Sequence, residues 1–230
     1  MPEINSVFFA LIGGISPALL WLWFWRREDR AHPEPLHLIA LAFLAGMLTV
    51  AIVIPVQKYV ATFALGTTLT FIAWSCIEEV TKYLSARFTV LKNRAADEPI
   101  DMVIYMVAVA LGFAAIENAL FLLSPLSGSG TWDVVLTGNL RFVGATLLHV
   151  LSSAVIGIFL ALSFYKTKNI KRIFAFSGVI LAAILHSGFN LLILNTSDEH
   201  LFRTFSLVWV GVIVVLALLE IIKRIRRRFN

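Results

Sequence analysis

Charged residues are scarce in this sequence, and their scarcity argues against a soluble globular domain. Only 14% of the 230 residues are charged, whereas soluble domains carry about a quarter. Hydrophobic residues make up 59% of the chain, and the mean hydropathy is +0.87. A chain of this length with so few charges is expected to lie in a membrane.

Cysteine is nearly absent, and a signal peptide is not apparent. Cys76 is the single cysteine, so no intrachain disulfide can form, and the redox compartment cannot be inferred. The first residues, MPEINS, lack the positive charge that precedes the apolar core of a signal peptide, so we expect no cleaved signal. The net charge is +5, but the basic residues stand in short runs between apolar stretches, so we expect no nucleic-acid partner.

Seven apolar segments are each long enough to cross a bilayer as a helix, which takes about 20 residues. They cover 5–25, 37–57, 62–86, 102–123, 138–165, 171–194 and 202–222. Only QKYVAT separates the second from the third, and the fifth is long enough to be tilted or to extend into water. With no internal repeat and no separate soluble domain, the sequence predicts an all-α polytopic transmembrane helix bundle that forms one membrane-embedded domain over 1–230.

Lysines and arginines predict the orientation of this bundle. With the N-terminus outside, fifteen of the 19 basic residues fall in cytoplasmic loops and the C-terminal tail, and only Lys58 and Arg203 fall outside. This asymmetry under strict alternation favours about seven spans with the N-terminus out and the C-terminus in. The basic tail is interpreted as a stop-transfer signal and an anchor to anionic lipids.

Ionisable residues interrupt four of the apolar segments. Such groups are unfavourable in the middle of a bilayer and usually face the interior of a bundle. They are Glu78, Glu79 and Lys82 in the third span, Glu117 with Asn118 in the fourth, Arg141 and His149 in the fifth, and His186 with Asn190 in the sixth. From the cytoplasmic ends of their spans, Glu78 lies ~12 Å deep and Glu117, His149 and His186 lie ~22–24 Å deep. We therefore expect four helices to bring these groups into one layer.

Spacing within the helices adds detail. Glu78 and Lys82 are four residues apart and can pair on one helix face, whereas Glu79 points about 100° away from Glu78. Gly157 lies two turns after His149, and a glycine there can let another helix or a substrate backbone approach closely.

The chemistry that suits these groups is hydrolysis. A carboxylate in a dry cavity is an effective general base toward water. Two histidines and a glutamate are also a recurring ligand set for catalytic zinc. Asn190 can donate a hydrogen bond to a developing oxyanion. Together these parts describe amide-bond hydrolysis, by either a metal or a metal-free glutamate mechanism.

Some of the polar residues have structural interpretations. Asn118 can be an interhelical hydrogen-bond partner, and Glu79 with Lys82 can form a structural ion pair. Arg141 lies near the end of its span, where it can snorkel to the interface or pair with a carboxylate. Packing alone does not account for the four groups expected in one layer.

Four motifs follow one another between about residue 74 and 195. They are Glu78-Glu79-Val80-Thr81-Lys82 (EExxK), followed by Asp101; Gly112-Phe113-Ala114-Ala115-Ile116-Glu117-Asn118 (GFxxxEN); Arg141, His149 and Gly157; and His186-Ser187-Gly188-Phe189-Asn190 (HxxxN). This stretch resembles the PrsW family of intramembrane proteases, which belongs to a wider group with the CAAX prenyl proteases. The glutamate pair, the GFxxxEN piece, the Arg–His–Gly stripe and the HxxxN piece follow in order, each on its own predicted helix.

The resemblance implies roles for these residues. Glu78 would be the general base that activates water. His149 and His186 would hold that water directly or through one divalent metal such as zinc, with Glu117 completing the ligand set. Asn190 would steady the oxyanion.

The resemblance also implies a supporting role for Glu79 and Lys82, with Lys82 tethering a carboxylate. Glu117 stands where the prenyl proteases have histidine, which favours the PrsW family over prenyl-peptide processing. The implied protein is an intramembrane peptidase of the prokaryotic plasma membrane, with a catalytic core at about 62–195 and a transmembrane or membrane-bound peptide as substrate. Some bacterial members cleave anti-sigma factors, but a substrate does not carry over from a fold and a site.

Two other functions use the same polar cluster. A non-enzymatic transporter or ion-conducting protein could relay protons or coordinate a cation there, although the inverted repeats and broken helices typical of transporters are not evident. A receptor-like or scaffold protein could carry the cluster as an inert site. The sequence names neither the substrate nor the oligomeric state.

Overall fold

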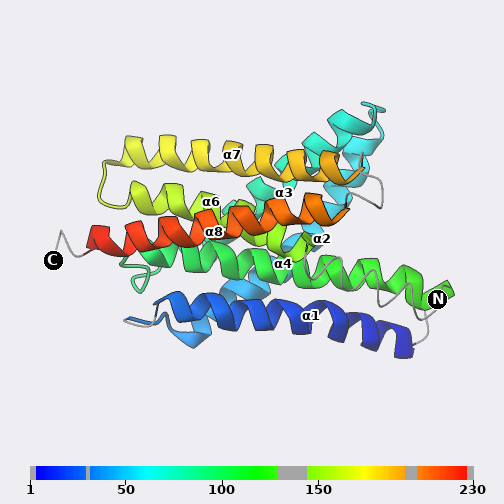
Figure 1. The fold of residues 1–230 in the computed structure, drawn as a ribbon, viewed down its shortest axis with the longest axis horizontal. Coiled ribbons are helices and arrows are strands. Elements are labelled where there is room, and N and C mark those ends of the chain that lie inside the picture. Colours follow the sequence, from blue (N-terminus) through cyan, green and yellow to red (C-terminus); the bar gives the residue numbers. More distant parts are fainter. Residues whose placement is uncertain (1–3, 30–31, 129–143, 195–200, 227–230) are drawn as a thin grey trace.

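The computed structural model describes residues 4–29, 32–128, 144–194 and 201–226, which form a bundle of seven α-helices (Figure 1). The helices are α1 (Ile4–Arg26), α2 (Leu36–Ala61), α3 (Thr67–Thr89), α4 (Pro99–Gly128), α6 (Thr146–Leu162), α7 (Lys168–Leu194) and α8 (Leu201–Arg226), with a short 3₁₀ turn η1 (Arg27–Asp29) after α1. These residues include no strand. The predicted all-α bundle is confirmed, with one helix for each predicted span.

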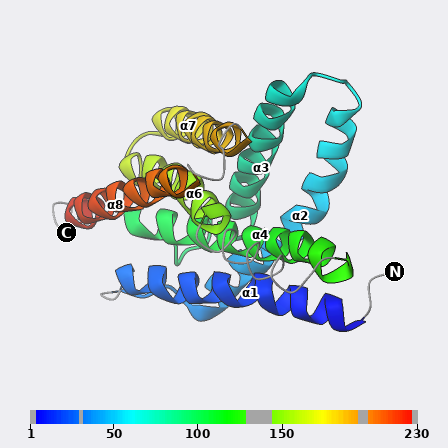
Figure 2. The same cartoon turned by 45° about the vertical axis from the view of Figure 1, so that its right-hand side comes forward.

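Helix α4 is the centre of the bundle. Residues 100–115 are all buried, and most of them are apolar on every side of the helix, as expected of a helix enclosed by others. Helix α1 packs along one side of α4 and α6 along the other, with α7 beyond α6 (Figures 1 and 2). Helices α2 and α3 form a hairpin that rises to one side (Figure 2).

Close packing around α4 depends on glycines. A Cβ on Gly46 of α2 would lie 2.0 Å from the carbonyl oxygen of Val109, and a Cβ on Gly157 of α6 would lie 2.6 Å from the Cα of Val103. Real side chains do not tolerate such distances, so both helices approach α4 only because these positions are glycine. The close approach predicted at Gly157 is therefore made by α4.

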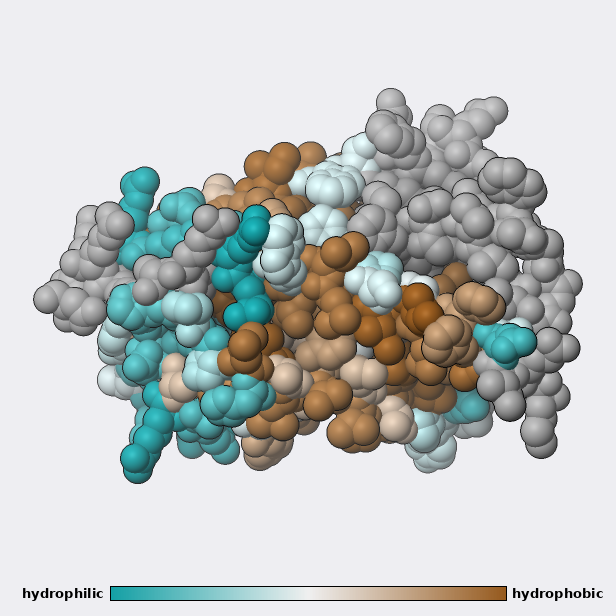
Figure 3. All heavy atoms as spheres, turned by 90° about the horizontal axis from the view of Figure 1, so that it is seen from below, coloured by the Kyte–Doolittle hydropathy of each residue, from teal (hydrophilic) through white to brown (hydrophobic). Residues whose placement is uncertain are grey.

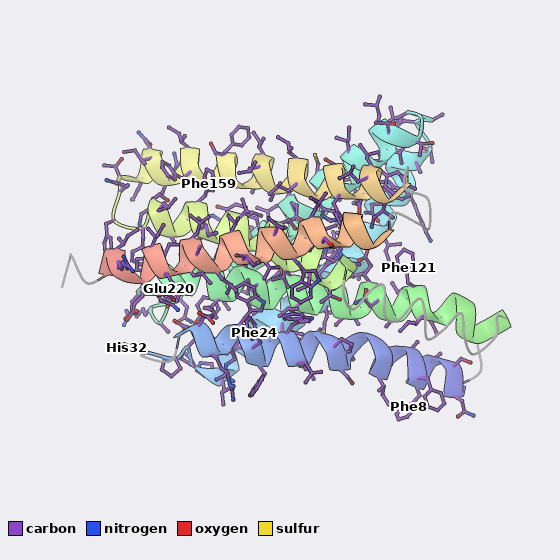
Figure 4. All side chains as sticks on the ribbon, in the orientation of Figure 1. Phe8, Phe24, His32, Phe121, Phe159 and Glu220 are labelled. Atoms are coloured by element: carbon purple, nitrogen blue, oxygen red, sulfur yellow. The ribbon has the colours of Figure 1, made fainter. Side chains whose placement is uncertain are left out.

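The surface and composition of the helices are those of a multi-pass membrane protein. Among the described residues, α1, α2, α4, α7 and α8 are long and apolar enough to cross a membrane. Helix α6 is not among these five because it has only 17 residues, and α3 is not among them because it carries the charged residues of the cluster. Figure 3 shows hydrophilic residues gathered at one end of the molecule, beside a broad apolar belt. His32 and Glu220 lie toward that end, whereas Phe8 and Phe121 lie toward the other (Figure 4).

The arrangement agrees with alternating helix directions. Helices α1 and α8 end, and α7 begins, at the same end of the bundle (Figure 1). The basic residues next to these helix termini therefore lie at one end of the bundle, as the predicted distribution of Lys and Arg among the loops requires. The assignment of that end to the cytoplasm, with the N-terminus out, stays a prediction.

Two predicted boundaries differ from the structure. The break between the second and third spans was expected at 57–62, but α2 continues to Ala61 and the turn lies at 62–66. Gln57, predicted to end the second span and begin the break, lies inside α2 and bonds within the bundle. The fifth span was expected at 138–165, and α6 ends at Leu162; its predicted start and Arg141 lie outside the described residues.

Candidate active site

His149 of α6 lies at the centre of the predicted polar cluster. Its Nε2 is 2.6 Å from Oε2 of Glu117 on α4, and its Nδ1 is 3.9 Å from Oε2 of Glu78 on α3. Its ring meets the ring of His186 on α7 edge-on, with the ring centroids 5.0 Å apart. The structure therefore brings the four groups from four helices into one layer, as their depths predicted.

Each histidine is held by its own carboxylate. His186 Nδ1 lies 2.7 Å from Glu79 Oε1, and His149 Nε2 contacts Glu117. A carboxylate on one ring nitrogen makes that nitrogen the N–H donor and leaves the lone pair on the other. The other nitrogens both face Glu78, whose Oε2 is 3.6 Å from His186 Nε2. One carboxylate oxygen therefore lies between two imidazole lone pairs.

Glu79 is the anchor of a buried network. It accepts hydrogen bonds from Lys82 Nζ at 2.5 Å, from Ser152 Oγ at 2.9 Å and from Ser153 Oγ at 3.3 Å. Lys82 and Glu79 are fully buried, so their charges compensate one another where water cannot. The ion pair proposed for Glu79 and Lys82 is therefore present. The pair with Glu78 that the sequence also allowed is not formed among the described residues.

Lys82 reaches a second member of the cluster. Its Nζ lies 3.3 Å from His149 Nδ1, while it holds Glu79 on its other side. The tethering role that the resemblance implied is consistent with this contact. Lys82 thus links the carboxylate that orients one histidine to the ring of the other.

Gln57 of α2 belongs to the site and was missed by the sequence analysis. Its Nε2 donates to Glu78 Oε1 at 2.8 Å, and Trp74 Nε1 donates to its backbone carbonyl at 3.2 Å. The other oxygen, Glu78 Oε2, is buried and has no hydrogen-bond partner among the described residues. Gln57 therefore fixes which carboxylate oxygen is left for the two histidines. The available signal was a polar residue at the end of an apolar run, but it was interpreted as the start of the break between two spans.

The two asparagines lie beside the cluster. Asn118 donates to Thr146 Oγ1 on α6 at 2.8 Å, which confirms its interpretation as an interhelical hydrogen-bond partner. Asn190 lies one turn after His186 and donates to Ser75 Oγ on α3 at 3.3 Å. Its predicted contact with an oxyanion stays a prediction.

Asp101 of the matching motifs lies elsewhere, in the first turn of α4. Its Oδ2 accepts the backbone N–H of Glu98 at 2.6 Å, and Tyr105, one turn later, donates a hydrogen bond to Glu34. Burial raises the pKa of Glu34 by more than its hydrogen bonds with Tyr105 and Asp101 lower it, and the charges of Asp97 and Glu98 raise it further. About 24 Å of helix separates this end of α4 from Glu117, so Asp101 does not belong to the polar cluster.

The cluster fits a divalent metal. One ligand atom from each of Glu78, His149 and His186 lies within 4.8 Å of the other two. Ligands of a tetrahedral zinc lie roughly 3.4 Å apart, close to the 3.6 and 3.9 Å between Glu78 Oε2 and the two ring nitrogens. Glu78 Oε2 has no hydrogen-bond partner among the described residues, and a cation beside it would satisfy this oxygen. A cation bound to His149 Nδ1 would take the place of the contact with Lys82 Nζ. The predicted ligand set shares both histidines, but here Glu117 is the hydrogen-bond partner of His149.

A buried carboxylate between two carboxylate-held imidazoles, enclosed in a membrane bundle, is the arrangement expected of a membrane-embedded hydrolase. Comparison with known proteins agrees. Residues 34–219 match the sequence profile of the PrsW family intramembrane metalloproteases. The chain belongs to this family, and the family and its curated relatives show that it is a membrane protease.

Curated relatives cover most of the chain. It is 28% identical to Protease PrsW of Geobacillus kaustophilus over 81% of the chain and 80% of that relative. It is 29% identical to Protease PrsW of Clostridioides difficile over 78% of the chain and 77% of the relative. It is 24% identical to Protease PrsW of Bacillus subtilis over 83% of the chain and 85% of the relative. No solved structure matches the chain significantly.

Proposed function

We propose that this protein hydrolyses a peptide bond of a transmembrane or membrane-bound peptide, at a centre formed by Glu78, His149 and His186. The observation that carries the proposal is Glu78 Oε2, which is buried, lacks a hydrogen-bond partner among the described residues, and faces both imidazoles. A water molecule in this position can donate one hydrogen to Glu78 Oε2 and the other to an imidazole nitrogen that is held in a fixed orientation. We place the enzyme in the prokaryotic plasma membrane.

The residues divide the work as follows. Glu78 takes a proton from the water as it attacks the carbonyl carbon, and it returns the proton to the leaving amine. His149 and His186 orient the water, because Glu117 and Glu79 hold their outer nitrogens. Asn190 donates its amide to the developing oxyanion, and Lys82 balances the charge of Glu79.

A metal would add to this chemistry. A divalent metal such as zinc, held by Glu78, His149 and His186, would polarise the attacked carbonyl and make water a stronger nucleophile. The donor set, two imidazoles with a carboxylate, is one that zinc prefers.

Water can enter from the side of Glu117. The side chain of Glu117 is 22% exposed, whereas that of Glu78 is 8% and those of the histidines are 3% exposed.

The four helices that carry these groups are α3, α4, α6 and α7. We propose that they form the catalytic core, within the predicted range 62–195, and that Gln57 extends it into α2.

The test is the variant Glu78→Gln, which keeps the shape of the side chain. Purified full-length protein is incubated with a synthetic transmembrane peptide, and products are identified by mass spectrometry. Loss of a general base lowers the rate by roughly 10²–10⁴-fold. The matched control is Glu220→Gln, which removes an exposed carboxylate from α8. Wild-type rates in Glu78→Gln would overturn the proposal.

Metal content, measured on the same samples, separates two roles of Glu78. If Glu78→Gln loses activity and keeps its metal, Glu78 is the general base. If it loses both, Glu78 is a ligand, and Glu117 is left as the proton acceptor beside His149. The transporter alternative is not favoured, because the relatives are proteases.

A further inference from the structure

A groove lies between α3 and α7 on the outside of the bundle. It encloses about 950 Å³, and Leu160 of α6 and Met102 of α4 are among the other residues that line it. Its walls are apolar and exposed, and they include Ile72, Val80 and Leu84 of α3 and Phe176, Ile180 and Ile184 of α7. Between Ile72 and Arg87, α3 runs for about 22 Å, which is one leaflet of hydrocarbon, about 15 Å, plus part of the headgroup region.

Five cations surround one end of this groove. They are Arg87 at the end of α3, Lys92 in the turn that follows, and Lys168, Lys171 and Arg172 at the start of α7. All five side chains are exposed. Among the described residues, no carboxylate forms an ion pair with any of them. The groove thus presents an apolar wall that ends in an uncompensated positive charge.

The groove is separate from the catalytic cluster. Neither Glu78 nor the two histidines line it, although Ser187, next to His186, does. Glu79 and Lys82 point into the bundle and are fully buried, whereas Val80 lies on the groove side of α3 and is 41% exposed. An occupant of the groove would therefore touch the two helices that carry Glu78 and His186 without reaching the reactive groups.

We propose that this groove binds one anionic phospholipid, with its acyl chains along the apolar walls and its phosphate among the five cations. Anionic headgroups are attracted to clustered Lys and Arg at the membrane surface. The loop charges predict that this end of the bundle is cytoplasmic. The cytoplasmic flanks of transmembrane segments are themselves rich in Lys and Arg, which disfavours such a segment as the occupant. The proposal does not depend on the proposed hydrolysis, since binding is measured without a peptide.

The experiment is native mass spectrometry of the full-length protein in detergent, titrated with dioleoyl phosphatidylglycerol or with dioleoyl phosphatidylcholine. The wild type should take up one phosphatidylglycerol with a Kd at least about tenfold lower than that of phosphatidylcholine. In Arg87→Gln/Lys171→Gln, the Kd for phosphatidylglycerol should rise roughly 10- to 30-fold, since each cation near the headgroup contributes about fivefold. Phosphatidylcholine binding should hardly change.

The matched control removes the same charge from the same end of the molecule. Lys166→Gln/Arg224→Gln alters two exposed cations that do not line the groove, so the Kd for phosphatidylglycerol should stay within about twofold of the wild type. Val80→Trp places a large side chain in the groove and should weaken the binding of both lipids. Thermal melts show whether each variant is folded.

Three results would overturn the proposal. Equal losses of affinity for phosphatidylglycerol in the two double variants would mean that the general surface charge attracts the lipid. Equal affinity of the wild type for the two lipids would exclude a site for the anionic headgroup. Tight binding of a synthetic acidic transmembrane peptide, with no phosphatidylglycerol adduct, would assign the groove to a protein segment.

Discussion

Replacing Gln57 by methionine isolates the hydrogen bond that orients Glu78. Methionine has nearly the same length and volume as glutamine but no amide donor. The backbone of residue 57 stays anchored, because Trp74 Nε1 bonds to its carbonyl oxygen, which the substitution keeps. The change therefore frees Glu78 Oε1 and leaves α2 in place.

The size of the effect follows from the 2.8 Å bond between Gln57 Nε2 and Glu78 Oε1. A hydrogen bond to a charged group contributes about 1.5–3 kcal/mol. If the bond is kept in the transition state and lost in the variant, kcat/KM falls roughly 10- to 150-fold. The fall is smaller than that for Glu78→Gln, because the base itself remains.

The assay is cleavage of a synthetic transmembrane peptide by purified protein, with thermal melts of each variant. The control is Thr49→Val, which removes a buried hydroxyl on the same helix that donates to Ala45 at 2.8 Å and lies outside the site. Thr49→Val should keep near wild-type kcat/KM. A rate for Gln57→Met within about twofold of the wild type, beside an inactive Glu78→Gln, would refute the positioning role of Gln57.

Three further outcomes are expected. Burial raises the pKa of Glu34 above that of the unfolded chain, so its contribution to stability is present at acid pH and is lost as the pH rises through the raised pKa; Glu34→Gln should flatten the dependence of Tm on pH. Gly157→Leu should lower Tm by several degrees, since even a Cβ would lie 2.6 Å from the Cα of Val103. Glu79→Gln should weaken metal binding roughly 10- to 100-fold, measured by competition with a chelator, because Glu79 holds Nδ1 of His186 at 2.7 Å.

Each of these outcomes has a result that would contradict it. An unchanged slope of Tm against pH in Glu34→Gln would mean that another group governs the acid dependence. A normal Tm for Gly157→Leu would mean that α6 can move away from α4. Unaltered metal affinity in Glu79→Gln, with Glu220→Gln as the control, would mean that the orientation of His186 does not depend on this carboxylate.

The polar cluster shows how far a single sequence leads. Glu78, Glu117, His149 and His186 were predicted to share a layer because helix rise converts residue number into depth, and the structure places them in contact. The depth of a residue does not give the rotation of its helix against the others. The spacing of Lys82 allowed it to pair with either glutamate, and only the packed structure shows that it pairs with Glu79.

The sequence alone determined that this is a membrane protein of about seven helices with glutamates and histidines inside it, because hydropathy and helix length are local properties of the chain. The tertiary structure decided what lies between helices: Gln57 on Glu78, a separate carboxylate on each histidine, and the groove between α3 and α7. Such contacts depend on how helices far apart in sequence turn toward one another. Scarcity of charge identified the membrane, and packing arranged the few charges that remain.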